Sequence, residues 1–487
     1  MSSPFELTAR EARWLIGAKR LSPVELLESC IAQIERINPA VNAVVTECFA
    51  RARVEAKRAE QAAVAGEALG PLHGIPIAIK DNQDTEGLRT AHGSPHYRDN
   101  VPTADSGVVG VIREAGGIIV GKTNIPEMSI GANTVNRLFG ATGNPFDPQR
   151  TCGGSSGGSA VALSCEMVPL ATGSDHGGSL RIPASFCGVV GHRSSAGVVP
   201  NEKRALAHSV YSVQGPMARS VGDAALLLSV IARRPTRDPL AFPLDPAPFA
   251  RLDEIDLGRL RVAVSADLGG LLVSQEIRQI FRDRVTRFGG LFRECAWHDI
   301  DLGDAPDVDW KLRSEIFVAQ YHDGADGWDA DFNPNIKHNY AAALQMPMRD
   351  VAIAHRRQME LCQRFQRIFD EFDLLICPTV SVSPFPWADL YPQSVDGRTI
   401  RTYMEWLGLT ASLTVVGHPV TALPCGRDAH GMPFGLQVVG PNFADHAVLS
   451  AAQALEAAFA ADPVLARPSP DFAGLAAAPL LSKEAAR

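Results

Sequence analysis

Apolar residues over 5–66 recur at the spacing of helices that bury one face. Two capping boxes, Thr8 with Glu11 and Ser22 with Glu25, mark helix starts, and Pro23 occupies a first helical position. The apolar positions that follow are one, three or four residues apart: Leu26, Leu27, Ile31, Ile34 and Ile37. The pattern predicts a pair of scaffold helices packed on a larger body.

From residue 69 onward the pattern changes to short apolar runs bounded by glycine, proline and asparagine. Runs of strand length lie at 74–79, 116–121, 259–265, 374–378 and 435–440. Helical stretches lie at 105–115, 221–231, 274–288 and 341–372. This alternation is typical of an α/β protein in which helices cover a sheet.

The composition excludes several classes of protein. The chain has 487 residues, of which 46% are hydrophobic and 21% charged, and its formal net charge is −8. No basic run offers a footprint for nucleic acid or an anionic membrane, and no apolar run has the length of a signal peptide or a membrane span. Nine scattered cysteines indicate no disulfide framework. We expect a soluble, cytoplasmic protein with no nucleic-acid partner and no membrane partner.

Three motif matches are not supported by their context. Residues 116–123 satisfy the Walker A pattern, but their middle positions are strand formers, and Pro126 interrupts the helix that should follow. His92 and His96 lie four apart, but the glycine and proline between them argue against a helix that presents both. The acidic stretch 323–331 lacks the ligand spacing of a calcium loop. We therefore expect no nucleotide and no metal at these positions.

Two turns rich in glycine and serine carry the strongest candidate chemistry. Their sequences are Thr151-Cys-Gly-Gly-Ser-Ser-Gly-Gly-Ser159 and Gly173-Ser-Asp-His-Gly-Gly-Ser-Leu-Arg-Ile-Pro183. Apolar segments alternate with them, which indicates turns within a folded core rather than a flexible linker. Glycine lets successive N–H groups approach one oxygen. We expect such an arrangement, an oxyanion hole, to be formed by His176, Gly177, Gly178 and Ser179.

A lysine is the candidate base for a serine nucleophile. A serine hydroxyl reacts poorly without a base, and no Gly-x-Ser-x-Gly elbow points to a histidine. Lys80 ends the apolar run 75–79, and a lysine that ends a buried strand loses hydration, which favours its neutral form. Taken alone, such a lysine more often reaches the surface. Its combination with the two serine-rich turns favours catalysis.

The Lys80 strand and the two turns resemble the amidase signature family of Ser-Ser-Lys hydrolases. The resemblance extends over 70–200, 374–378 and 417–440. It implies a single large α/β/α domain around a central mixed, mainly parallel twisted sheet covered by helices. The parts of that domain are a helical scaffold at 1–66, the core with the catalytic residues at 67–232, a divergent helical region that determines the substrate at 233–373, a return to the sheet with a C-terminal helix at 374–475, and a tail at 476–487.

The resemblance also implies roles for individual residues. Ser179 is expected to be the nucleophile, Ser155 the bridging serine and Lys80 the base, which together form and hydrolyse an acyl-enzyme. No metal and no organic cofactor is needed for this cycle. The bridging serine of the family follows a cis peptide bond, so the Gly154–Ser155 bond is expected to be cis. The residues expected to support the site are Gly154, Ser156, Asp175 and Arg181, the last two through charge-assisted hydrogen bonds to the nucleophile turn.

The sequence departs from the family pattern at two places near these residues. His176 stands where small or aliphatic residues are commoner, and His192 with Arg193 follows Gly191. We expect His176 to line the pocket or to bond a neighbouring loop rather than to transfer protons.

Substrate choice is expected to lie in the divergent part of the chain. Eight of the Trp and Tyr residues, of which the chain has six each, fall within 310–406: Trp310, Tyr321, Trp328, Tyr340, Trp387, Tyr391, Tyr403 and Trp406. They predict an apolar or aromatic pocket for a small-molecule amide, or else they only pack the helical insertion. Anilides, aryl amides, aliphatic amides, carbamates and esters all stay open as substrates.

An alternative function is the glutaminase-type A subunit of a tRNA-dependent amidotransferase, which works inside an assembly. The acidic charge balance and the aromatic-rich insertion favour a free-standing amidase instead. A non-catalytic binding protein is disfavoured because Lys80, Ser155 and Ser179 are all present. No pattern sets the oligomeric state, and a homodimer stays open.

Overall fold

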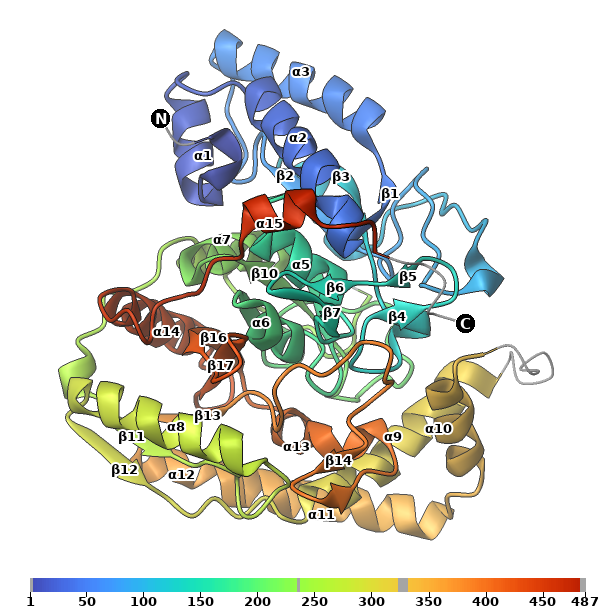
Figure 1. Cartoon of the computed structure of the whole chain (residues 1–487), viewed down its shortest axis with the longest axis vertical. Helices are drawn as coiled ribbons and strands as arrows, with labels where there is room; N and C mark the ends of the chain where they lie inside the picture. The colour runs from blue at the N-terminus through green and yellow to red at the C-terminus, as the bar shows by residue number, and fades with distance from the viewer. Residues whose placement is uncertain (1–2, 234–236, 323–331, 482–487) are drawn as a thin grey trace.

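One mixed sheet runs through the residues that the computed structural model describes, 3–233, 237–322 and 332–481. Within them its order is β1-β3-β2-β8-β10-β9-β16-β17-β13-β11-β12 (Figure 1). The strands are β1 (Val44–Glu47), β2 (Pro76–Lys80), β3 (Ile118–Thr123), β8 (Leu170–Asp175), β9 (Val190–Arg193), β10 (Val213–Ala218), β11 (Arg261–Val264), β12 (Glu294–Trp297), β13 (Leu374–Pro378), β16 (Val420–Arg427) and β17 (Pro433–Val439). Short separate hairpins are formed by β4 (Val135–Asn136) with β5 (Gly140–Ala141), β6 (Gly143–Asn144) with β7 (Asp147–Thr151), and β14 (Ser394–Val395) with β15 (Arg398–Thr399).

The sheet is mixed as expected, but the expectation that parallel pairs predominate is wrong. Among the described strands, the parallel pairs are β2 with β3, β2 with β8, β11 with β12, and β11 with β13. The other six neighbouring pairs are antiparallel. The reason lies in the connections: the short turn 428–432 between β16 and β17 permits only an antiparallel pair, whereas a helix connects β2 to β3.

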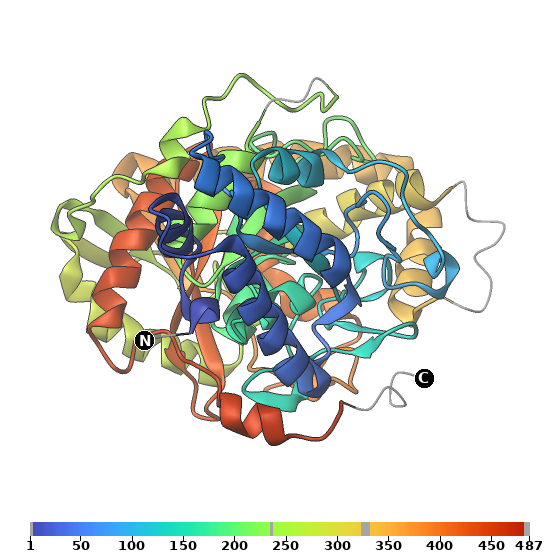
Figure 2. The same cartoon turned by 90° about the horizontal axis from the view of Figure 1, so that it is seen from above.

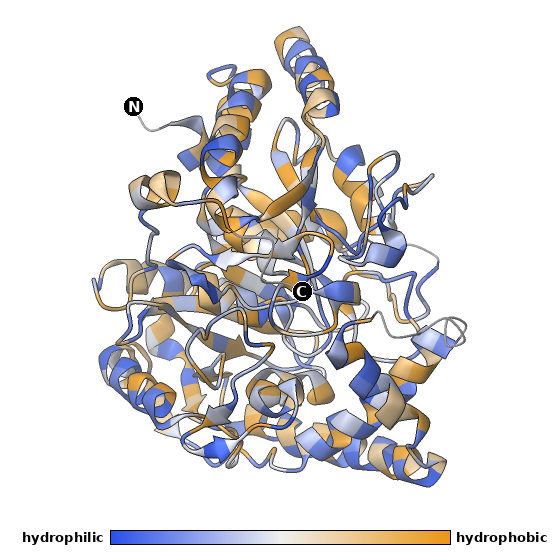
Figure 3. Cartoon of the chain, turned by 45° about the vertical axis from the view of Figure 1, so that its right-hand side comes forward, coloured by the Kyte–Doolittle hydropathy of each residue, from blue (hydrophilic) through white to orange (hydrophobic). Residues whose placement is uncertain are grey.

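Helices cover both faces of this sheet, with the N-terminal helices at one end of the molecule and α8–α12 at the other (Figures 1 and 2). In chain order they are α1 (Ala9–Gly17), α2 (Pro23–Val41), α3 (Phe49–Ala65), α4 (Gly107–Glu114), α5 (Gly157–Ser164), α6 (Arg181–Cys187), α7 (Val221–Ile231), α8 (Gln275–Phe288), α9 (Ala305–Tyr321), α10 (Pro334–Leu344), α11 (Met348–Gln366), α12 (Ile368–Glu371), α13 (Gly408–Val416), α14 (Asp445–Ala460) and α15 (Phe472–Ala477). The peripheral helices carry both hydrophilic and hydrophobic residues, as expected of helices that bury one face (Figure 3). Within the described ranges, no helix is both long and apolar enough to cross a membrane.

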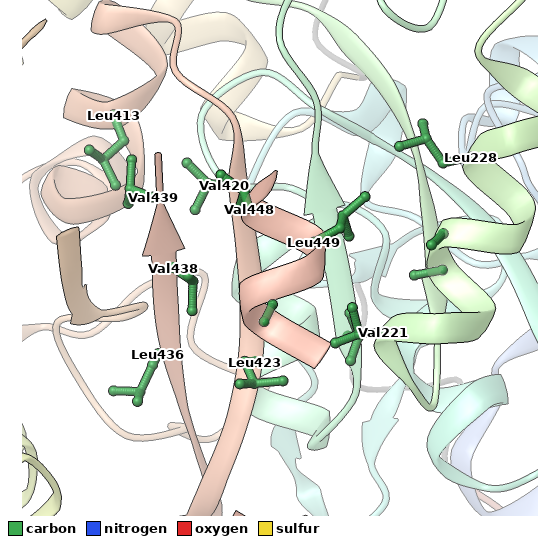
Figure 4. Packing of buried hydrophobic residues seen from close by; sticks show 14 of the residues in the cluster. Val221, Leu228, Leu413, Val420, Leu423, Leu436, Val438, Val439, Val448 and Leu449 are labelled. Carbon is green, nitrogen blue, oxygen red and sulfur yellow. The ribbon is translucent and has the colours of Figure 1, made fainter. Parts of the chain in front are cut away.

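Alternation along the strands separates the two buried layers. Ile77 and Ile79 of β2 belong to the large cluster that also contains α4, α7 and α14, while Ala78 between them belongs to the cluster of α5 and α6. Figure 4 shows part of the first layer, where Val448 and Leu449 of α14 lie beside β16. Helices α5 and α6, which flank the serine-rich turns, therefore pack on the opposite face from α7 and α14.

One segment contains a strand that was not predicted, and another confirms that the Walker A match is not a phosphate-binding loop. The segment 1–66 contains the predicted helices but also β1, whose β-branched residues pair with β3 at the edge of the sheet. The Walker A match falls on β3, so its middle residues are a buried strand and not a phosphate-binding loop. Its lysine, Lys122, donates hydrogen bonds to Thr85 Oγ1 and Thr90 Oγ1 inside the protein. The acidic stretch 323–331 lies outside the described residues.

Candidate active site

Lys80 ends β2 as predicted, and its ammonium group is completely buried. Its Nζ donates hydrogen bonds to Ser155 Oγ at 2.8 Å and to Ser174 Oγ at 2.9 Å. Its backbone N–H donates to Thr172 Oγ1 on the neighbouring β8. Ser174 is not among the residues predicted from the sequence, although it stands directly before Asp175 in the second serine-rich turn.

Burial changes the proton affinity of this lysine. Loss of hydration lowers the pKa of Lys80 to about 7, and the negative charge of Asp175 opposes only part of that shift. Lys80 therefore has a substantial neutral fraction near pH 7. A neutral amine has a free electron pair and can accept a proton, which an ordinary surface lysine cannot do at that pH.

The first serine-rich turn is fixed between β7 and α5. The Gly154–Ser155 peptide bond is cis, which confirms the expectation for this position. The next residue, Ser156, connects the two turns: its N–H donates to Ser179 O at 3.1 Å, and its Oγ accepts from the Ser174 N–H at 3.3 Å. Ser156 therefore holds the two turns at a fixed separation.

Ser179 lies on the second turn, between the end of β8 and the start of α6. Ser155 and Ser179 line the same cavity, whose volume is about 320 Å³. No direct hydrogen bond joins the two hydroxyls among the described contacts, so the bridge between them is not closed in this conformation. Gly178, directly before Ser179, has φ +127°, and a Cβ there would lie 2.4 Å from Thr410 Oγ1. Only glycine fits at that position.

The Asp175 carboxylate fixes the conformation of the second turn through hydrogen bonds. Its carboxylate accepts hydrogen bonds from the N–H groups of Gly178 at 2.8 Å and Leu180 at 3.1 Å. It also accepts from Arg181 Nε and Nη2, each at 3.0 Å, and from Arg193 Nη1 at 3.2 Å. Burial alone would raise the pKa of Asp175, but the two guanidinium groups outweigh it and hold the pKa well below its usual range.

One of the four backbone N–H groups predicted to form the oxyanion hole already donates a hydrogen bond within the protein. Because the Gly178 N–H already donates to Asp175, this amide is not free to stabilise an oxyanion in this conformation. The N–H groups of His176, Gly177 and Ser179 form no hydrogen bond within the described structure. Three of the four predicted oxyanion donors are thus available beside the Ser179 hydroxyl.

His176 lies on the cavity wall. Its ring packs against Tyr211, with 5.1 Å between ring centroids, and its buried Nε2 has no hydrogen-bond partner among the described residues. Burial, reinforced by the charges of Arg313 and Arg193, lowers the pKa of His176 well below its usual value. The ring is therefore neutral.

The residues of this site predict a family that comparison with known proteins confirms. A family model described as Amidase matches residues 25–290 and 327–449. The chain belongs to the amidase signature family. This amidase is an enzyme that hydrolyses amide bonds.

Three relatives of this amidase have informative names. An acylamidase from Rhodococcus erythropolis is 33% identical over 93% of this chain and 95% of its own. A solved bacterial aryl acylamidase superposes with a TM-score of 0.85 at 27% identity, over 94% of this chain and 96% of its own. The A subunit of the glutamyl-tRNA(Gln) amidotransferase of Picosynechococcus sp. is 31% identical over 91% of this chain and 96% of its own.

Part of the cavity wall comes from the segment 313–407. Helix α9 contributes Arg313, Phe317 and Tyr321, and the 3₁₀ helix Tyr403–Leu407 contributes Tyr403. The sequence predictions included Tyr321 and Tyr403 but missed Phe317 and Arg313, because phenylalanine and arginine are common on helices and no local pattern marks these two. Its cation–π contacts with Phe317 and Tyr403 are visible only in three dimensions.

The aromatic residues of 310–406 serve both expected purposes. Tyr321 and Tyr403 line the cavity and also belong to the core cluster in which Trp406 is buried against Phe186 and Phe385. Trp328 lies outside the described residues.

A second cavity adjoins the first. Its volume is about 630 Å³, and it shares Leu206, Ser209, Tyr211 and Ile316 with the cavity of the two serines. It is larger and more apolar, but neither Ser155 nor Ser179 lines it, whereas both line the smaller cavity, which is therefore the candidate active site. In the described part of the chain, no group of three or more His, Cys, Asp or Glu side chains is arranged to hold a metal ion.

Proposed function

We propose that this amidase cleaves small apolar or aryl amides through a serine acyl-enzyme, with Ser179 as nucleophile, Ser155 as bridge and Lys80 as base. The observation that carries the proposal is the 2.8 Å contact between Lys80 Nζ and Ser155 Oγ beside a cavity that Ser155 and Ser179 both line. A buried lysine with a pKa of about 7 is a suitable base near neutral pH.

The proposed cycle moves one proton along three side chains. Neutral Lys80 accepts the Ser155 proton while Ser155 accepts the Ser179 proton, and Ser179 Oγ attacks the amide carbonyl carbon. The N–H groups of Gly177 and Ser179, with that of His176, stabilise the oxyanion. Ser155 then gives a proton to the leaving nitrogen as the C–N bond breaks. Water hydrolyses the resulting ester on Ser179 through the same relay in reverse.

Small substrates with an apolar or aromatic part fit this cavity best. Its volume is about 320 Å³, and Phe317, Tyr321 and Tyr403 contribute rings to its wall. The names of the acylamidase and aryl acylamidase relatives support the same class. Carbamates and aryl esters react by the same acyl transfer and belong in the test.

A second candidate is a glutaminase subunit of an amidotransferase, which the Picosynechococcus relative supports. Glutamine carries an ammonium group that needs a negative partner. No aspartate or glutamate lines the described part of the cavity, which favours the free-standing amidase over this candidate.

The test is release of a chromophore from aryl anilides, aryl esters and aryl carbamates by the purified protein alone. Ser179→Ala and Ser155→Ala are compared with wild type, and Ser229→Ala on α7 serves as the matched control because its hydroxyl only bonds Leu226 O. We expect turnover by wild type and Ser229→Ala and its loss in the other two variants. Turnover that survives Ser179→Ala would overturn the mechanism. Ammonia release from glutamine, with no turnover of the panel, would favour the second candidate.

A further inference from the structure

The cavity of the two serines has an unbalanced charge. The described residues that line it include three cations, Lys203, Arg204 and Arg313, but no aspartate or glutamate. Two of the cations are neutralised from outside the cavity: Lys203 pairs with Asp84, and Arg204 pairs with the buried Asp238 at 3.0 Å. Arg313 is the third cation, and among the described residues no carboxylate forms an ion pair with it.

Arg313 is buried and only partly satisfied. Arg313 is 6% exposed. Its Nη2 donates a hydrogen bond to Tyr403 Oη, whereas its Nε has no hydrogen-bond partner among the described residues. Its guanidinium lies over the rings of Phe317 and Tyr403, at 4.9 Å and 5.7 Å from their centroids. Aromatic faces attract a cation, but they do not replace a carboxylate.

The nearest candidate counter-ion does not pair with it. Asp309 lies one helical turn earlier on α9, yet within the described structure it forms no ion pair with Arg313. Burial raises the pKa of Asp309 to about 6, while the positive charge of Arg313 lowers it, so the two groups attract each other without forming an ion pair. The other polar groups around Arg313, His176 and Tyr211, are neutral side chains on the same wall.

We propose that Arg313 determines specificity by pairing with a carboxylate on the substrate, so that the preferred substrates are aryl or apolar amides that carry one carboxylate and no ammonium group. This inference rests on the proposed function, since it names the substrate class of the same site. A guanidinium presents two parallel N–H groups to a carboxylate, and the free Nε with a neighbouring Nη offers that arrangement. The rings of Phe317 and Tyr403 would pack on the apolar part of such a substrate.

The test uses two pairs of substrates that differ in charge but not in shape. The first pair is the mono-4-nitroanilide of succinic acid and the 4-nitroanilide of 4-methylpentanoic acid, which place the charge on the acyl side. The second pair is 4-acetamidobenzoate and 4-acetamidobenzamide, which place it on the amine side. We expect wild type to prefer the anionic member of one pair by about tenfold or more in kcat/KM.

Variants of Arg313 test whether this residue causes the preference for the anionic substrate. Arg313→Gln should remove the preference, so that the ratio of kcat/KM between the anionic and the neutral member falls to about one, and Arg313→Lys should keep part of the preference. Arg287→Gln is the control, because Arg287 lies on α8, pairs with Asp462 at the surface and does not line the cavity. Equal kcat/KM for both members of both pairs, or a preference that survives Arg313→Gln, would overturn the inference.

Inhibition of wild type gives a measurement that needs no variant. Benzoate should inhibit turnover of a neutral anilide at a lower concentration than benzamide does, because only benzoate pairs with Arg313. Equal inhibition by the two compounds would contradict the inference even if Arg313→Gln does not fold. Turnover of neutral anilides without any charge preference would overturn the inference alone, whereas no turnover of any substrate by the folded protein would overturn the proposed function as well.

Discussion

Lys80 Nζ lies 2.8 Å from Ser155 Oγ, although 75 positions separate the two residues in the chain. The fold brings them together because β2 pairs with β8, and α5, which begins just after Ser155, packs on both strands. The lysine thus ends a strand in the interior, where its ammonium group is shielded from bulk solvent. Its chemistry follows from that burial more than from any neighbouring charge.

The rate should depend on pH through Lys80. Because only the neutral amine accepts a proton, kcat/KM should rise about tenfold per pH unit below about pH 7 and level off above it. The measurement is kcat/KM for a non-ionising anilide from pH 5 to 9.5, with circular dichroism at each pH to confirm the fold. A rate that falls across this range while the fold is intact would exclude Lys80 as the base.

Stability should depend on the same lysine and should also rise with pH. The folded pKa of about 7 lies below the ordinary value of 10.5, so between these values the unfolded state binds more protons and wild-type stability rises with pH. Below about pH 7 the folded state carries the buried cation. Lys80→Met should therefore raise the thermal midpoint relative to wild type at pH 6, and the gain should shrink toward pH 10.

The control for this prediction is a lysine whose side chain is exposed to solvent. Lys57→Met on α3 changes an exposed side chain and should alter the midpoint little, with the same small difference at pH 6 and pH 10. A gain for Lys80→Met that stays constant across pH would mean that packing rather than charge causes it.

Ser174 should act as a positioning residue. Its Oγ accepts a hydrogen bond from Lys80 Nζ at 2.9 Å and thereby favours the charged lysine. Ser174→Ala should lower kcat about tenfold with little change in KM, and it should move the midpoint of the pH–rate profile to lower pH. Ser174→Thr, which keeps the hydroxyl, should restore the midpoint. A purely structural role would leave the midpoint where it is in wild type.

Two adjacent glycines offer a matched test of the nucleophile turn. Gly178 has φ +127° and a Cβ there would meet Thr410, whereas a Cβ at Gly177 would meet nothing within 4 Å. Gly178→Ala should lower the free energy of unfolding by about 1–3 kcal/mol and remove activity, because the turn must move. Gly177→Ala should retain the thermal midpoint of wild type. Equal midpoints for the two variants would contradict the strain argument.

Asp175 should be indispensable for stability. Asp175→Asn leaves Arg181 and Arg193 buried without their shared counter-charge, which typically costs about 3–5 kcal/mol of folding free energy. Thermal unfolding of the purified variant measures the loss. Asp462→Asn, which breaks the surface pair with Arg287, is the control and should change the midpoint little.

Local patterns predicted those parts of the site that depend on neighbours in sequence. The buried run before Lys80 predicted β2, and the glycines around Ser155 and Ser179 predicted turns that approach a substrate closely. The resemblance supplied the cis bond at Ser155, which no periodicity would have revealed.

The remaining features depend on contacts between distant segments. Arg313 meets Tyr403, 90 positions away, and nothing beside either residue marks that meeting. The antiparallel majority of the sheet likewise depends on which strands become neighbours, as with β9 between β10 and β16. Hydrophobic patterns identify a strand and its buried faces, but they do not specify its partner or its direction.

Helix α9 belongs to two cores at once, with Leu312 in the main cluster and Phe317 in the separate cluster around Trp406. The serines and the lysine, in contrast, come from β2 and the turns on either side of β8. In the proposed mechanism, bond cleavage and selectivity are thus encoded in separate stretches of the gene. Directed evolution restricted to the codons of α9 can therefore sample new substrate ranges while the hydrolytic apparatus is inherited unchanged.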